Sequence, residues 1–197
     1  NNALIGNEVT GVVTINVAGD STADGGYTDL TGIDKFTNLT TLNCAYNSGI
    51  TSLDLSGFTK LESLNITGLT NLEILNISGC TNLTDEKITG LDTCTALIEL
   101  NVSGCTSLGE LDCYGNKFST AGYDSLMCSF IDYSGMGIDN YFSPLYDTND
   151  ANSAIFLAAN ASNATAKNWQ VLYYDNDNTI TTNGSYTCTF GGENPQA

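Results

Sequence analysis

The sequence predicts an α/β solenoid of stacked coils, built mostly of short β-strands and loops with few short helices and closed by a β-rich cap at each end. Three observations support this prediction: a leucine motif recurs at a fixed spacing, the residues between its apolar positions are polar, and the motif stops before both ends of the chain. The chain has 197 residues, 41% of them hydrophobic, so one apolar core accounts for its length.

The leucine motif has the form L-x-x-L-x-ϕ, in which ϕ is apolar, and copies within a run begin 11 residues apart. Repetition at a fixed period predicts units that stack on one another. One coil of about 22 residues then carries two short strands. The copies are Leu39-x-x-Leu42-x-Cys44, Ile50-x-x-Leu53-x-Leu55, Leu61-x-x-Leu64-x-Ile66, Leu72-x-x-Leu75-x-Ile77, Leu97-x-x-Leu100-x-Val102 and Leu108-x-x-Leu111-x-Cys113.

The residue between the last two apolar positions is Asn or Asp in every copy. Alternate side chains of a strand point to opposite faces, so the apolar pair lies inside and the polar residue outside. Stacked coils therefore predict two parallel strand ladders around one core. The outward residues are Asn43, Asp54, Asn65, Asn76, Asn101 and Asp112.

The regular spacing is interrupted between Leu75 and Leu100, where three additional residues are inserted. A short helix from Asp85 to Thr93 is the best prediction for this segment. Thr84 precedes it as an N-cap, and acidic residues follow at the positive end of the helix dipole.

The segment Leu72–Asp85, followed by Leu91 and Cys94, matches the pattern L-x-x-L-x-L-x-x-C-x-x-L-T-D. It resembles the cysteine-containing leucine-rich repeat. The 11-residue copies resemble the short, nested repeats of secreted and surface leucine-rich-repeat proteins of Bacteroides-like bacteria. The resemblance covers about Leu30 to Leu126 and implies a leucine-rich-repeat solenoid, whose relatives bind many different ligands.

Three parts follow from the limits of the repeat. Residues 1–29 form an N-terminal β cap with a strand at Val12–Val17, and residues 30–133 form the solenoid. Residues 134–197 form a C-terminal cap, in which we expect a strand at Ala154–Leu157, a helix at Ala161–Trp169 and a strand at Gln170–Tyr174. A β-hairpin follows, from residues 179–182 through a turn at Asn183-Gly184 to residues 186–190.

Composition excludes several functions. The chain has 22 acidic residues against five basic ones, a formal net charge of −17, and all five basic residues are lysines. Such a surface repels nucleic acid and anionic membranes. Histidine and arginine are absent, so a His-dependent catalytic triad and a bidentate anion clamp are excluded. We expect no enzyme activity and no cofactor.

The seven cysteines are predicted to be mostly reduced and buried. Cys80 and Cys105 occupy equivalent repeat positions, at which leucine-rich repeats often carry an asparagine that bonds neighbouring loop backbone. A disulfide between Cys80 and Cys105 is the alternative. No C-x-x-C spacing suggests a metal centre. The acidic segments Asp147–Asp150 and Asp175–Asn178 are predicted to be turns, with weak cation binding as the alternative.

We expect a non-enzymatic binding module of the cell surface, periplasm or secreted space, already free of its signal peptide. A protein or a glycan would bind the face that the predicted helix leaves concave. The alternatives are a structural spacer in a surface complex and, less favoured, a glycoside hydrolase. The expected binding residues are Ser52, Asp54, Ser56, Ile74, Asn76, Ser78, Glu99, Asn101 and Ser103.

Overall fold

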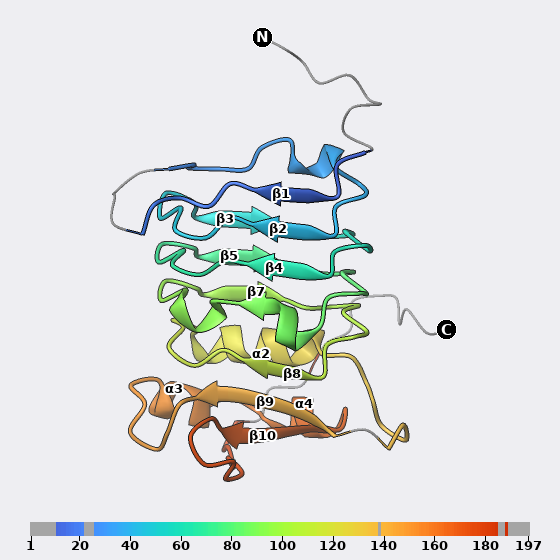
Figure 1. Cartoon of the computed structure of the whole chain (residues 1–197). Helices are drawn as coiled ribbons and strands as arrows, with labels where there is room; N and C mark the ends of the chain where they lie inside the picture. Colours follow the sequence, from blue (N-terminus) through green and yellow to red (C-terminus); the bar gives the residue numbers. More distant parts are fainter. Residues whose placement is uncertain (1–10, 22–25, 138, 185–187, 189–197) are drawn as a thin grey trace.

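A computed structural model of the chain describes residues 11–21, 26–137, 139–184 and 188. In this part the protein is a small α/β fold with three parallel sheets and few helices (Figure 1). From β2 to β7 the chain passes alternately between the first two sheets, so neighbouring strands there are not consecutive in sequence. In the third sheet the neighbours are consecutive.

The first sheet has the strand order β1-β2-β4-β6, with all pairs parallel. Its central leucines are in register, with Leu42 beside Ile15 on one side and Leu64 on the other. Strand β1 therefore extends the ladder of the repeat. The strands are β1 (Thr14–Asn16), β2 (Thr41–Asn43), β4 (Ser63–Asn65) and β6 (Ile88–Thr89).

The second sheet has the order β3-β5-β7 and is also parallel. Leu53, Leu75 and Leu100 lie in one buried row, and Asp54, Asn76 and Asn101 lie in the next row, on the outer face. The strands are β3 (Ser52–Asp54), β5 (Ile74–Asn76) and β7 (Glu99–Asn101).

The third sheet, of order β10-β9-β8, is combined with the α-helices. Strand β8 (Glu110–Asp112) pairs with β9 (Asn140–Leu145), which pairs with β10 (Trp169–Tyr173). Between them come α2 (Thr120–Ser129), α3 (Ser153–Leu157) and α4 (Ser162–Thr165). The expected boundary between residues 133 and 134 falls between two paired strands of this sheet.

A recurring turn ends the short strands. The Asp54 carboxylate accepts the N–H of Ser56 at 2.9 Å, and the same contact recurs from Ser78 to Asn76. The glycine that follows, Gly79 in the second case, has a φ of 75°. A Cβ at this position would lie 3.5 Å from the backbone of Gly57 in the previous turn. A left-handed, closely stacked corner favours glycine.

The core is continuous and consists mainly of the leucines and isoleucines of the motif, which are almost fully buried. Toward the C-terminal end it becomes aromatic, with Phe130 stacked on Trp169 at a centroid distance of 4.4 Å. The same core therefore runs through all three sheets.

The predicted helix at Asp85–Thr93 is wrong. The segment forms a 3-10 turn η2 (Asp85–Lys87), then β6, and a second 3-10 turn η3 (Leu91–Thr93). Gly90 prevents a continuous helix, because its φ of 92° is left-handed, and a Cβ at this position would clash with the backbone of Thr67. No side-chain capping bond forms at Thr84. Strand β6 pairs with β4, so this segment extends the first sheet.

The C-terminal predictions hold in part. The expected strand at Ala154–Leu157 belongs to helix α3, whereas a short helix and a strand form where residues 161–174 predicted them. Residues 179–182 form no strand, and their β-pairing is an isolated bridge from Thr179 to Leu172. Of the expected final strand, residues 186–190, all but Cys188 lie outside the described residues. Neither α2 nor β9 was predicted.

Helix lengths bear on membrane insertion. Among the residues described, no helix combines the length and the apolar character needed to cross a membrane.

Candidate functional site

The nine residues expected to bind a ligand lie together along β3, β5 and β7 and in the turns that follow. Six of them are exposed, and the other three, Asn76, Ser78 and Asn101, are half-buried. Ser52, Ile74 and Glu99 are register partners and form one row across the sheet. Neighbouring parallel strands lie about 4.8 Å apart, so the row repeats at that spacing.

The two outward rows of this face differ in what their side chains do. Asp54, Asn76 and Asn101 accept N–H groups from the serines two residues later, at 2.9–3.1 Å. These contacts hold the turns in place, which is a structural role. The row of Ser52, Ile74 and Glu99 lies one step earlier on the strands, and Ile74 keeps 38% of its surface exposed.

The geometric reason for choosing this face is not supported. We expected a helix on the opposite side of the coils, but helix α2 packs against β7 on the same side (Figure 1). The backbone N–H of Val102 reaches Ser129 Oγ of that helix at 3.3 Å. Curvature therefore gives no reason to choose this face. The side chains of the exposed row on β3, β5 and β7 are the remaining reason.

Five cysteines are free and buried: Cys44, Cys80, Cys94, Cys105 and Cys113. Cys80 Sγ donates to the carbonyl of Leu55 at 3.2 Å and Cys105 Sγ to that of Ile77 at 3.1 Å, so the two thiols do not bridge. Burial raises the pKa of Cys80 to about 12 and that of Cys105 to about 11. A protonated, buried thiol is a poor nucleophile.

The two remaining cysteines, Cys128 and Cys188, form a disulfide that sequence reasoning missed. Cys128 lies at the end of α2, and its partner is 60 residues further along the chain. Neither cysteine belongs to the repeat, so no spacing indicated the pair.

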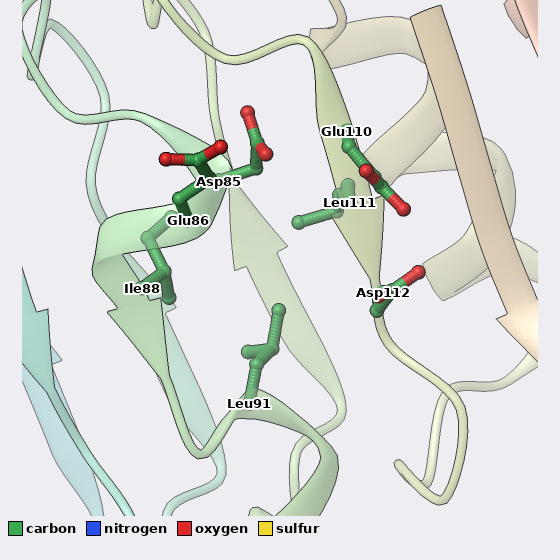
Figure 2. Close-up of a pocket in the computed structure, with 7 residues that line it drawn as sticks. All are labelled: Asp85, Glu86, Ile88, Leu91, Glu110, Leu111 and Asp112. Atoms are coloured by element: carbon green, nitrogen blue, oxygen red, sulfur yellow. The ribbon is translucent and has the colours of Figure 1, made fainter.

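A pocket of about 240 Å³ lies where the first sheet ends and the third begins. Strands β6 and β8 face each other there without pairing, and Leu91 and Leu111 extend into the space between them (Figure 2). The residues lining it are Asp85, Glu86, Ile88, Leu91, Glu110, Leu111 and Asp112.

The acidic residues of this pocket affect one another. Burial, together with the charges of Asp112 and Asp85, raises the pKa of Glu110. Burial and the charge of Asp85 also raise the pKa of Asp112, and Asp112 Oδ1 is buried without a hydrogen-bond partner. The described residues include no group of three or more His, Cys, Asp or Glu side chains placed to hold a metal ion.

The two acidic segments that suggested weak cation binding act as turn residues. Asp147 accepts the N–H of Asn149 at 2.7 Å, and Asp150 accepts the N–H groups of Tyr146 and Asn152 at 3.0 and 2.8 Å. Asn176 accepts the N–H of Asn178 at 3.0 Å. Their oxygens therefore stabilise loops of the chain itself.

Three tyrosines meet just beyond the carboxyl ends of β8, β9 and β10. Tyr114 lies 4.5 Å from Tyr174 and 5.4 Å from Tyr146, measured between ring centroids. Tyr146 and Tyr174 retain 48% and 44% of their surface exposed. Burial and the nearby charge of Asp92 raise the pKa of Tyr114, whose phenol stays protonated.

Sequence reasoning did not group these tyrosines, because β9 was not predicted. A weak signal exists in the pattern Tyr-Asp, which ends an apolar stretch and begins a turn at Tyr146-Asp147 and at Tyr174-Asp175. The pattern is not specific, because it also occurs as Tyr123-Asp124 inside α2.

No protein-family model matches the sequence, and a comparison with curated proteins also finds no match.

Proposed function

We propose that the chain is a leucine-rich-repeat solenoid that acts as a non-enzymatic binding module for a protein or a glycan. The observation that supports it most is the exposed row of Ser52, Ile74 and Glu99, which repeats across three parallel strands in register. A row of side chains at constant spacing matches an extended ligand, and this use is common in stacked-repeat proteins.

The chemistry of the row suits such a ligand. Ile74 offers an apolar contact, while Ser52 and Glu99 offer a hydroxyl and a carboxylate. Binding surfaces combine a few apolar anchors with polar groups around them. No reactive thiol or histidine lies on this face.

We propose a location in the secreted space, in the periplasm or at the cell surface. The disulfide between Cys128 and Cys188 supports it, because such bonds persist in oxidising compartments. The acidic surface, with a formal net charge of −17, does not favour nucleic acid as a partner.

A screen of glycans and proteins from the native surroundings tests the proposal, with the variant Ile74→Lys/Glu99→Lys beside the wild type. Both side chains point outward and are register partners, so the change alters the surface without removing a turn contact. The matched control is Thr41→Lys/Ser63→Lys, a register pair on the first sheet. We expect the first variant to lose the ligand and the control to keep it.

Two results would contradict the proposal. If the folded first variant binds the ligand unchanged, the face is not the binding surface. If the only stable associations found are with components of a surface complex, and neither variant alters them, a spacer role explains the protein better.

A further inference from the structure

We infer that Tyr114, Tyr146 and Tyr174, with the carboxylates around them, form a docking surface for a basic, arginine-bearing segment of a partner protein. We call these three residues the tyrosine surface. It lies on the third sheet, apart from the row on β3, β5 and β7, and the inference does not rest on the function proposed for that row.

The three tyrosines form a contiguous aromatic cluster, and two of its rings are exposed to solvent. Tyr146 contacts both other rings, with centroid distances of 5.4 Å to Tyr114 and 5.8 Å to Tyr174. An aromatic cluster that remains open to solvent is a frequent mark of an interaction surface. Tyrosine is enriched at such surfaces because it gives a large contact area at a small entropic cost.

The position of the rings is well defined. The backbone N–H of Tyr174 donates to the carbonyl of Leu145 at 3.1 Å, and that of Asp175 donates to the carbonyl of Tyr146 at 3.0 Å. The loops after β9 and β10 are thus joined beyond the ends of the strands. A surface held in this way loses little freedom when a partner binds.

Negative charge surrounds the rings of the tyrosine surface. The carboxylates of Asp92 and Asp112 act electrostatically on Tyr114, and Asp175 follows Tyr174 directly. Among the described residues, no lysine forms an ion pair with Asp92, Asp112 or Asp175. Negative charge without a counter-charge is complementary to a cationic partner.

Arginine fits this surface better than the other candidates. Its planar guanidinium stacks on an aromatic face while its N–H groups bond a carboxylate. The ring centroids lie 4.5–5.8 Å apart, so the rings pack on one another and leave no cage for a cation between them. A neutral glycan could stack on the same rings, but it would gain nothing from the charge.

The test uses the full-length protein and three synthetic peptides in which glycine alternates with arginine, lysine or citrulline. Isothermal titration calorimetry at about 0.15 M salt, where long-range attraction is screened, should show binding in the order arginine, lysine, citrulline. We expect Tyr146→Ser/Tyr174→Ser to weaken binding of the arginine peptide at least tenfold. Tyr146→Phe/Tyr174→Phe should retain most of it.

Two controls separate the tyrosine surface from general acidity. Tyr27→Ser removes a tyrosine that is 54% exposed and lies outside the cluster, and it should change the affinity less than twofold. Asp92→Asn/Asp175→Asn should weaken binding while Ile74→Lys/Glu99→Lys should not. These results do not depend on whether the screen described above finds a ligand for the row on β3, β5 and β7.

Four results would overturn the inference. Equal binding of the arginine peptide by the wild type and by Tyr146→Ser/Tyr174→Ser would mean that the peptide is attracted by the overall negative charge and not by the tyrosine surface. Equal affinity for the arginine and citrulline peptides would show that charge is not recognised. If no peptide binds, the partner is not a basic segment. Binding of a neutral oligosaccharide that depends on Tyr146 and Tyr174, without binding of the arginine peptide, would assign the surface to a glycan.

Discussion

Two regions of the molecule fill their cores with different side chains. In the repeat region, residues 39–113, leucines and isoleucines fill the core and each strand is about as long as the next. In the C-terminal region, residues 118–184, aromatic side chains fill it, among them Phe130, Phe142 and Trp169. The third sheet joins the two, because β8 pairs with β9.

The corners differ as well. In the repeat region, side chains of Asn47, Cys80 and Cys105 donate to backbone carbonyls of neighbouring turns, and Asn116, just after the last repeat, does the same. In the C-terminal region, Lys167 Nζ donates to the carbonyls of Cys128 and Phe130 at the end of α2, at 2.7 and 3.0 Å. A repeated contact can be specified by a short motif, whereas a single contact needs two distant residues.

The comparison predicts that the repeat region depends on the C-terminal region. Deleting residues 134–197 removes β9 and β10, exposes the edge of β8 and uncovers Phe130. We expect the fragment to aggregate or to lose cooperative unfolding, because an open end of a stacked core shows apolar surface to water. Size-exclusion chromatography and thermal unfolding measure this. A monomeric fragment with the melting temperature of the full chain would show that the regions are independent.

Core substitutions sharpen the comparison. Trp169→Ala should cost about 3–5 kcal/mol of unfolding free energy, and Leu75→Ala about 2–5 kcal/mol. Leu64→Ala and Leu100→Ala should resemble Leu75→Ala, since all three leucines are at most 4% exposed in equivalent rows. Urea denaturation gives the values. If the three leucine variants lose amounts of unfolding free energy that are spread over the whole range of about 2–5 kcal/mol, the rows are not equivalent.

The sequence allowed prediction where one residue type recurs in one environment. The strands at Leu42, Leu53, Leu64, Leu75, Leu100 and Leu111 were placed correctly, as were the buried thiols of Cys80 and Cys105. Strand β6 was missed because Ile88 stands in an irregular copy. Helix α2, strand β9 and the tyrosine surface were missed because contacts between distant residues, such as Phe130 with Trp169, hold them in place.

The disulfide between Cys128 and Cys188 should stabilise the C-terminal region against unfolding. Removing it by Cys128→Ser/Cys188→Ser should lower the unfolding free energy by about 2–4 kcal/mol, mainly because the unfolded chain gains freedom. Adding reductant to the wild type should have the same effect and should leave the double variant unchanged. A reductant effect on the double variant would point to a second disulfide.

The smallest effect is expected at the junction of the two regions, where burial raises the pKa of Glu110 and of Asp112. A carboxyl group whose pKa is higher in the folded protein than in the unfolded chain contributes its full stability below the pKa of the unfolded chain. This stability is lost as the pH rises through the pKa of the folded protein. At pH 7 the charged pair therefore lowers stability. Asp112→Asn should raise the melting temperature slightly at pH 7 and much less near pH 4. Glu62→Gln, at an exposed position, is the control and should change nothing at either pH.

A count of thiols tests most directly the claim that the repeat region holds reduced cysteines as buried corner contacts and that the C-terminal region holds the oxidised pair. The account predicts few reactive thiols in the native protein, five after denaturation without reductant and seven after reduction, from the five free cysteines and one disulfide. Five of the seven cysteines then agree with the expectation that they are mostly reduced, and Cys128 and Cys188 do not. Peptide mapping should find Cys128 joined to Cys188. Seven thiols without reductant, or a bond between Cys80 and Cys105, would contradict the account.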